Sequence, residues 1–366
     1  MSLELNIHTD IRRASTPSSE LYTSPSVFEA MKDRIFAASW QFAALERDLK
    51  APGQTWPFTL LPGFLDEPLL FTRDYDDQLH CLSNVCTHRG NLVCEQGGIE
   101  KQLRCRYHGR RFDLRGRMLG MPEFEGVVDF PSESDHLPQV AFERWGGMLF
   151  VSLKPSFSFA EAFAPMQQRL HWLDVGSFRF SPEHSKDYLI QANWALYCEN
   201  YLEGFHIPYV HASLNAVLDY GNYTTETYRY SNLQLGYAKD GELSFQLPAS
   251  SPDYGKRIGA YYYWIFPNLM FNFYPWGLSV NVVKPITVSQ TRVTFLTFVA
   301  DEQLFESGTV AMIDRVERED EAVVENVQRG VRSRLYRKGR YSPRREQGTH
   351  HFHLLLAEFL SSKNEV

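Results

Sequence analysis

Apolar positions at helical spacing open the chain. Residues 24–44 begin with Ser-Pro, a common helix start, and place apolar side chains three and four apart, which predicts an N-terminal helix. From there to about residue 155 the pattern changes to short alternating runs, such as PLLFTR, QLHCLSNVC and KQLRCRYHG, separated by the turn-forming stretches DYDDQ and EQGGIE. This alternation predicts small antiparallel sheets joined by tight turns.

The second half of the chain combines the helical and the strand periods. Helical spacing over 156–176 precedes a strand that runs into a helix over 187–206, and strands rich in Tyr, Phe and Val follow over 260–286 and 292–300. A last helical segment over 304–335 carries one apolar stripe, formed by Val310, Ile313, Val316, Val323, Val324, Val327 and Val331. The pattern predicts an α+β chain: an N-terminal extension and helix at 1–44, an antiparallel β domain at 45–160, and a larger domain of antiparallel sheet and helices at 161–366.

Composition narrows the class of protein. The 366 residues are 43% apolar, which is enough for two hydrophobic cores. A formal net charge of −7 with 22% charged residues does not indicate binding to nucleic acid. The chain has no signal-peptide run and no stretch of about 18 apolar residues, so we expect a cytoplasmic protein with no membrane segment. Five cysteines, a low and odd count, favour metal ligands or buried thiols over disulfides.

Two short motifs, CTHRG and CRYHG, repeat one arrangement of metal-ligating residues. Cys86 and His88 stand as C-x-H, and Cys105 and His108 as C-x-x-H. Such a set suits either a tetrahedral zinc ion or a [2Fe-2S] cluster with two histidine ligands. Each motif contributes one Cys and one His, which favours the cluster over a zinc finger. The glycine that follows each motif permits the tight backbone that wraps a cluster.

Other residues of metal-binding type have simpler interpretations. His80, Cys81 and Cys94 alternate with apolar neighbours, which indicates core positions. Arg89 is a candidate either for a fixed cation beside the cluster or for a surface ion pair. The run HHFH at 350–353 points its histidines to different faces and indicates packing or subunit contacts more than a further metal site.

A second group of metal-ligating residues lies in CENYLEGFHIPYVH, residues 198–211. Glu199, Glu203 and His206 are spaced to share one face of a helix, and His211 follows Pro208. Two histidines beside carboxylates predict a non-haem iron site, which requires one further carboxylate.

Asp320 is the predicted third iron ligand, because it occupies the apolar seam of the 304–335 helix. A buried carboxylate there needs a cation or a hydrogen-bond partner. The neighbouring Glu317 and Glu321 are expected to be solvated or paired with Arg315 and Arg318.

The first group of residues resembles the Rieske iron-sulfur domain, whose two ligand motifs are matched by Cys86, His88, Cys105 and His108. Many relatives have Trp after the second His-Gly, and this chain has Arg110.

The second group resembles the catalytic domain of Rieske non-haem iron oxygenases, in which an acid, an acid and two histidines recur at the spacing of Glu199, Glu203, His206 and His211. The segment around Asp320 resembles the one that supplies the third iron ligand. Glutamate rather than aspartate at 203 is similar to the members that oxidise quaternary ammonium compounds, such as choline monooxygenase, carnitine oxygenase and betaine demethylases. The resemblance implies a helix-grip (START-like) catalytic domain with a [2Fe-2S] cluster, mononuclear Fe(II) and O₂ as co-substrate.

Further expectations follow from the resemblance. Electrons come from a separate NAD(P)H-dependent reductase, because the chain lacks a strand-GxGxxG-helix unit. A homotrimer is implied, in which Glu203 links the Rieske histidine of a neighbouring subunit to an iron-binding histidine. The product is a hydroxylated or N-demethylated small molecule, and candidate substrate contacts are Tyr201, Tyr263, Trp264 and Phe271. They belong to a wider set of aromatic residues that could surround an ammonium group or simply form the core of the sheet, which also includes Tyr261, Tyr262, Phe273, Tyr274 and Trp276. An aromatic-ring mono- or dioxygenase, or a Rieske electron-transfer or regulatory protein, are the alternatives.

Overall fold

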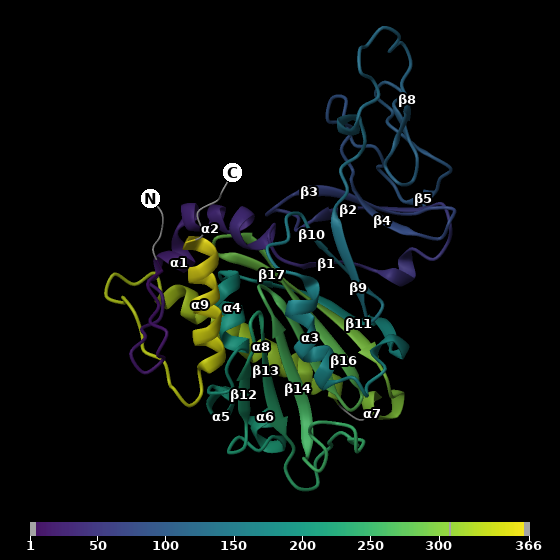
Figure 1. The fold of residues 1–366 in the computed structure, drawn as a ribbon. Coiled ribbons are helices and arrows are strands. Elements are labelled where there is room, and N and C mark those ends of the chain that lie inside the picture. The colour runs from purple at the N-terminus through teal and green to yellow at the C-terminus, as the bar shows by residue number, and fades with distance from the viewer. Residues whose placement is uncertain (1–4, 307–308, 362–366) are drawn as a thin grey trace. The chain divides into compact units, whose positions relative to one another are not determined.

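The chain folds into two compact units in a computed structural model (Figure 1). The structure describes residues 5–306 and 309–361, with the backbone alone for 309–313. The smaller unit comprises Trp40–Pro155, and the larger one combines the N-terminal segment up to Ser39 with everything from Ser156 onward. The predicted boundaries at 44/45 and 160/161 therefore lie a few residues too late, and the N-terminal extension is part of the larger unit. None of the helices in the described residues has the length and apolar character needed to cross a bilayer.

The N-terminal helix is shorter than its apolar spacing predicted. Helices α1 (Glu20–Thr23) and α2 (Pro25–Met31) continue into a π-helical turn, Lys32–Phe36, and strand β1 (Gln41–Leu45) follows. The predicted helical continuation to Ala44 is wrong, because β1 pairs antiparallel with β10 (Met148–Ser152), a strand buried along its whole length. Pairing with a buried strand outweighs the helical preference of a short apolar run.

The smaller unit consists of short antiparallel sheets, as the alternating runs predicted. Their strand orders are β1-β10-β9, β4-β3-β2-β5 and β6-β7-β8. The remaining strands are β2 (Gln54–Leu60), β3 (Glu67–Arg73), β4 (Leu79–Ser83), β5 (Gly98–Ile99), β6 (Leu103–Arg104), β7 (Arg111–Phe112), β8 (Met118–Gly120) and β9 (Ala141–Trp145), with 3-10 turns at Glu46–Asp48 and Glu133–Asp135.

One antiparallel sheet of seven strands organises the larger unit, in the order β11-β17-β16-β15-β14-β13-β12. The strands are β11 (Arg179–Ile190), β12 (Thr224–Thr227), β13 (Ser231–Tyr237), β14 (Ile258–Ile265), β15 (Leu269–Tyr274), β16 (Gly277–Thr287) and β17 (Gln290–Val299). Tyr262 of β14 pairs with Asn272 of β15, and Tyr263 with Phe271. Because side chains alternate along a strand, these two pairs face opposite sides of the sheet.

Helices cover both faces of this sheet. Helix α3 (Phe159–Arg169), which begins with a capping box at Ser158, packs on the face of Phe271, and Phe163 lies 5.8 Å from the Phe271 ring. Helices α4 (Trp194–Tyr201) and α8 (Thr309–Gly330) pack together and against β16 and β11, as Figure 1 shows. The other elements are α5 (Ile207–Val210), α6 (Ala212–Val217), α7 (Glu302–Glu306), α9 (Gln347–Ser361) and a 3-10 turn at Val175–Ser177.

Helix α8 buries a more polar stripe than predicted. Val324 and Val331 are buried as expected, but Val327 is 43% exposed, while Glu317 and Gln328 are buried. The side chains of Val310 and Ile313 lie outside the described residues. The buried polar groups have partners on the α4 side: the Tyr197 hydroxyl donates to Glu317 Oε1 (2.7 Å), and the Asn193 amide donates to Gln328 Oε1 (2.7 Å). The predicted solvation of Glu317 is thus wrong, because α8 turns that face toward α4.

Candidate functional site

The two Cys/His motifs form two equivalent tight turns. In the first, the Gly90 amide donates to the Cys86 carbonyl (3.0 Å), and in the second the Gly109 amide donates to the Cys105 carbonyl (3.1 Å). Both glycines have positive φ, +73° and +74°, which explains why glycine closes each turn. The turns bring the His88 and His108 rings to 4.8 Å between centroids.

The donor set on these turns fits a two-iron cluster. Cys86 and Cys105 are free, buried thiols, and His108 Nδ1 is buried without a hydrogen-bond partner among the described residues. Among the described residues, the ligand atoms of these two cysteines and two histidines do not all gather within 4.8 Å of one another. A single tetrahedral zinc ion requires such gathering, whereas a [2Fe-2S] cluster spreads its four ligands over two irons.

Arg110, which stands where many Rieske domains have Trp, lies inside the smaller unit. It is 2% exposed, and its Nη2 donates to Asp135 Oδ1 at 2.5 Å. The guanidinium also lies over the Phe130 ring, 5.5 Å from its centroid. Arg110 therefore belongs to the interior of the smaller unit, next to the second ligand turn.

The second group of residues begins at the end of α4. The predicted continuous helix from Glu199 to His206 is wrong, because α4 ends at Tyr201. Glu203 Oε2 instead accepts the His206 amide hydrogen (3.1 Å), and Gly204 packs so closely against Tyr223 that a Cβ there would lie 2.7 Å from the ring. Glu199 points elsewhere, with Oε1 3.0 Å from His353 Nε2 of α9.

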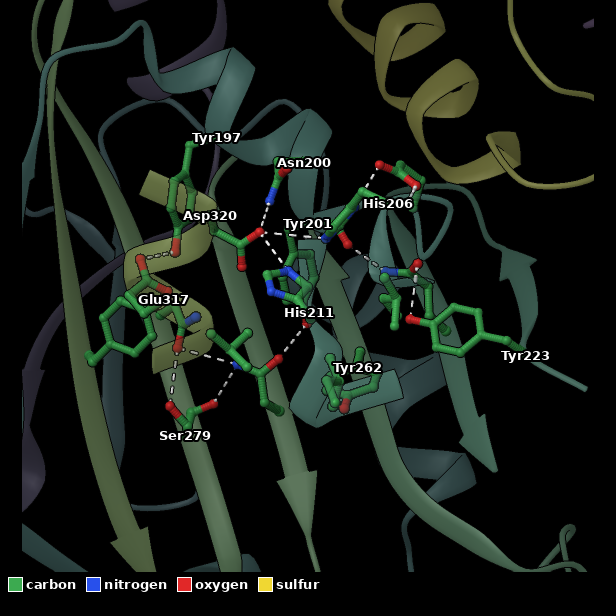
Figure 2. A pocket seen from close by; sticks show the side chains of 18 of the residues that line it. Tyr197, Asn200, Tyr201, His206, His211, Tyr223, Tyr262, Ser279, Glu317 and Asp320 are labelled. Carbon is green, nitrogen blue, oxygen red and sulfur yellow. Dashed lines mark hydrogen bonds and ion pairs between the residues drawn. The ribbon is translucent and has the colours of Figure 1, made fainter. Parts of the chain in front are cut away.

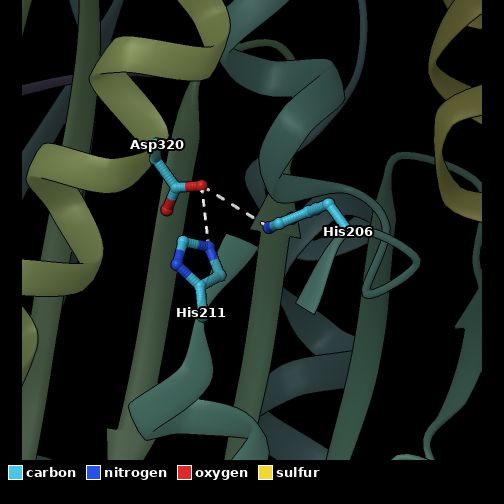
Figure 3. A group of neighbouring side chains, drawn as sticks. All are labelled: His206, His211 and Asp320. Carbon is cyan, nitrogen blue, oxygen red and sulfur yellow. Dashed lines mark hydrogen bonds and ion pairs between the residues drawn. The ribbon is translucent and has the colours of Figure 1, made fainter. Parts of the chain in front are cut away.

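Tertiary folding brings His206, His211 and Asp320 together although Asp320 is more than a hundred residues away along the chain (Figure 3). Their nearest ligand atoms all lie within 4.8 Å of one another, and Asp320 Oδ1 is 3.0 Å from His211 Nε2 and 3.5 Å from His206 Nε2. Two imidazoles and one carboxylate on one side of a site are the donor set of non-haem iron centres. These three residues fit a mononuclear iron.

Carboxylates hold the far nitrogen of each histidine. Glu203 Oε1 lies 2.7 Å from His206 Nδ1, and Glu319 Oε2 lies 2.7 Å from His211 Nδ1. A carboxylate behind a metal-ligating histidine fixes the ring and the tautomer, so that Nε2 faces the metal. Glu203 contacts His206, and its predicted link to a neighbouring subunit stays a prediction. Glu319 was not found from the sequence. Asn200 adds a hydrogen bond to Asp320 Oδ1 (2.6 Å).

A cavity of about 130 Å³ opens beside these three residues, between α4, α8 and the sheet (Figure 2). Five tyrosines line it, together with a polar group of Gln234, Asn272, Ser279 and Asn281. Burial raises the pKa values of Tyr197, Tyr201, Tyr223 and Tyr274 well above the ordinary range and that of Tyr262 to about 12, so all five are neutral phenols near pH 7.

The predicted substrate contacts divide between the cavity and the core. Tyr201 lines the cavity, and its hydroxyl donates to Asn272 Oδ1 (2.8 Å). Tyr263, Trp264 and Phe271 are fully buried and do not line it, which corrects that part of the prediction. Tyr263 and Phe271 face the other side of the sheet, and Trp264 packs against Phe352 of α9 (5.3 Å). The sequence contained a signal for this difference, because neighbouring side chains such as Tyr262 and Tyr263 point to opposite faces of a strand.

The cavity wall is acidic. Glu203, Glu317 and Asp320 line it, and it has no Lys or Arg among its lining residues. Glu317 is 5% exposed, and burial, followed by the charge of Asp320, raises its pKa well above the ordinary range. A buried carboxyl group with one hydrogen bond and no positive partner in the cavity is electrostatically suited to a cationic ligand.

The remaining candidates are structural. His80 pairs with Asp74 (2.9 Å) and is partly exposed, so its predicted core position is wrong, whereas Cys81 and Cys94 are buried as predicted. In HHFH, His350 meets the His8 carbonyl (2.8 Å), His351 meets Asn232 Oδ1 (2.9 Å), and His353 meets the Tyr341 hydroxyl (2.6 Å). These contacts hold α9 in place, as the packing interpretation predicted.

Arg89 makes an aromatic contact beside the first ligand turn. Its guanidinium carbon lies 5.5 Å from the Tyr107 ring centroid, and both side chains are exposed. A cation over an exposed ring contributes about 0.5–1 kcal/mol. The contact links the two ligand turns at the surface, and Arg89 remains a candidate for a cation beside the cluster.

Two ligand sets on two folded units, one for an iron-sulfur cluster and one for a mononuclear iron, define an iron-dependent oxidoreductase with an internal electron carrier. Family models match both units: residues 39–131 match the Rieske [2Fe-2S] domain, and 177–362 match the ring hydroxylating alpha subunit catalytic domain. The chain belongs to the family of Rieske oxygenases with a ring-hydroxylating alpha-subunit catalytic domain, and it is an enzyme that uses a Rieske cluster, mononuclear iron and O₂.

Similar proteins share nearly the full length of the chain. Choline monooxygenase of Arabidopsis thaliana chloroplasts is 31% identical over 94% of this chain and 83% of its own. The carnitine monooxygenase oxygenase subunit of Escherichia coli is 27% identical over 96% of each chain. A solved quaternary ammonium Rieske monooxygenase (TM-score 0.78, 24% identity, 98% and 99% covered) and naphthalene 1,2-dioxygenase of a Rhodococcus species (TM-score 0.73, 16% identity, 95% and 95% covered) share the fold. The predicted α+β fold is confirmed.

Proposed function

We propose that this chain is a terminal oxygenase that hydroxylates or oxidatively N-demethylates a small quaternary ammonium compound. The main observation is the lining of the cavity, which combines five neutral tyrosines with three acidic residues and no Lys or Arg. Aromatic faces and a carboxylate attract an ammonium head, whereas an aromatic hydrocarbon gains nothing from the acids. Relatives named for choline and carnitine oxidation support the same substrate class.

We assign the metal-binding roles residue by residue. Cys86 and Cys105 would hold one iron of the cluster and His88 and His108 the other. His206, His211 and Asp320 would hold the mononuclear iron from one side. When bound, the cluster supplies single electrons and the iron activates O₂.

The protein's own residues then orient the metal ligands and the substrate. Glu203 and Glu319 keep the ligating histidines in the tautomer that exposes Nε2. Glu317 faces the ammonium head, while Asn272, Asn281 and Gln234 offer hydrogen bonds to the polar end of the substrate. The partly buried walls exclude bulk water, which strengthens the attraction between Glu317 and the cation.

The proposed assembly is a homotrimer in which subunits associate head to tail. Glu203 would accept a hydrogen bond from a Rieske histidine of the neighbouring subunit, in addition to its contact with His206. Two aromatic side chains close to Glu203 in sequence are exposed, Phe205 at 39% and Tyr209 at 81%, which supports an interface there. The electrons would reach the cluster from a separate NAD(P)H-dependent reductase. A cytoplasmic location stays a prediction.

Oxygen and NADH consumption by the reconstituted system tests the proposal. Choline, glycine betaine, carnitine and simple arenes are compared, and formaldehyde release is followed in parallel. Substrate-dependent oxygen uptake with an ammonium compound supports the proposal, and formaldehyde identifies N-demethylation. Turnover of arenes with no response to any ammonium compound would identify an aromatic-ring oxygenase. Oxygen uptake no greater than reductase leak with every compound would indicate an electron carrier.

A further inference from the structure

Arg110 is an unusual residue in the core of the smaller unit. It is among the largest fully buried side chains described, and it lies with Phe112, Met118 and Phe130, which also pack against the core that contains both cluster cysteines. Its Nε lies 3.3 Å from the Met118 sulfur. A guanidinium in such surroundings keeps its charge and requires a partner.

The partner, Asp135, joins both ligand turns. Arg110 donates to Asp135 Oδ1 (2.5 Å) and to the Asp135 carbonyl (3.3 Å), while the Thr87 hydroxyl, between Cys86 and His88, donates to the same carbonyl (2.8 Å). On the other turn, the Cys105 amide donates to the Arg110 carbonyl (2.9 Å). The pair thus connects the first ligand turn to the second.

The two charges of the pair are unequally exposed to solvent. The Arg110 side chain is 2% exposed and belongs to the segment that closes the second turn, whereas the Asp135 side chain is 20% exposed and sits on a 3-10 turn. Water screens the carboxylate more than the guanidinium. A net positive potential therefore remains at the side of the pair that faces the ligand turns.

We propose that Arg110 is a positioning residue for the Rieske cluster, which raises the reduction potential of the cluster through its buried charge and fixes the two ligand turns through Asp135. A positive potential favours the reduced cluster, because reduction adds one negative charge. The role is independent of the substrate, so it holds whether or not the proposed ammonium oxidation is correct.

The test is a potentiometric titration of the purified full-length protein carrying its cluster, followed by circular dichroism and electron paramagnetic resonance. Arg110→Met is expected to lower the midpoint potential, Asp135→Asn to raise it, and Arg110→Lys to stay near the parent value. Arg111→Met, which removes an exposed charge one residue away, is the matched control and is expected to leave the potential unchanged.

Opposite shifts in the Arg110→Met and Asp135→Asn proteins are the decisive result. A merely structural role would move both potentials in one direction together with the resonance line shape, and this result would overturn the proposal. An unchanged potential in Arg110→Met overturns it as well. If Arg110→Met does not retain the cluster, Asp135→Asn decides, and a potential equal to or below the parent value contradicts the proposal.

Discussion

Replacement of Glu317 by Gln isolates the charge of the cavity wall. Glutamine keeps the shape of the side chain and an acceptor for the Tyr197 hydroxyl, which donates to Glu317 at 2.7 Å. The variant therefore removes the negative charge that Glu317 carries above its raised pKa, or once a cation has displaced its proton, and little else. If the substrate is a quaternary ammonium compound, its binding weakens, because the cation loses a carboxylate in a poorly hydrated site.

The size of the effect follows from the burial of Glu317. The methyl groups of a trimethylammonium head keep its nitrogen about 5 Å from a carboxylate oxygen, where the attraction is about 3 kcal/mol at an effective dielectric constant of about 20 and below about 1 kcal/mol in bulk water. A side chain that is 5% exposed belongs near the first value. Above the raised pKa of Glu317, where the carboxyl group of the parent protein is charged, the dissociation constant should rise by roughly 100-fold.

Titration calorimetry with two ligands tests this reasoning. Choline is compared with its carbon isostere, in which a quaternary carbon replaces the nitrogen. The substitution should weaken choline binding strongly and leave the isostere unaffected. Glu321→Gln is the matched control, because Glu321 lies on the same helix, pairs with Arg318 (3.6 Å) and does not line the cavity. Equal weakening of both ligands, or none of choline, would refute the role of the charge.

Three further predictions concern protons and metals. Cation binding favours the charged form of Glu317, so it lowers the raised pKa of this group and releases a proton. Binding of the cation should therefore strengthen as the pH rises toward the pKa of Glu317 in the free protein. Calorimetry in two buffers should detect the released proton, and Glu317→Gln should abolish the release. Glu203→Gln should keep both metals but reduce the product formed per NADH by about 10- to 100-fold. Iron content is the control, and unchanged substrate oxidation would contradict the proposed role of Glu203 in linking the two metal centres. Asp320→Asn should lose the mononuclear iron, so that iron falls from about three to about two per chain while the cluster spectrum persists.

Local sequence was sufficient to predict the two turns and the candidate metal ligands, whereas folding brings Asp320 to the two histidines. The Cys86 to Gly90 and Cys105 to Gly109 motifs determine two tight turns by themselves, because glycine is required at the positive φ that closes each turn. His206 and His211 also lie together in the structure, although the helix that was expected to lead to them ends at Tyr201. The side chain of Glu203 forms the next turn instead.

The sequence by itself was sufficient to predict the candidate metal ligands, the antiparallel sheets of both units and the helix that carries Asp320. Tertiary structure alone decided which faces of strands and helices meet the cavity. Tyr262 lines it while Tyr263 does not, and Glu317 is buried against Tyr197 although local charges predicted solvation. Ligand motifs are local in the chain, whereas the environment of a side chain depends on segments more than a hundred residues away. For the same physical reason, the burial of Arg110 beneath the cluster turns appeared only in the folded protein.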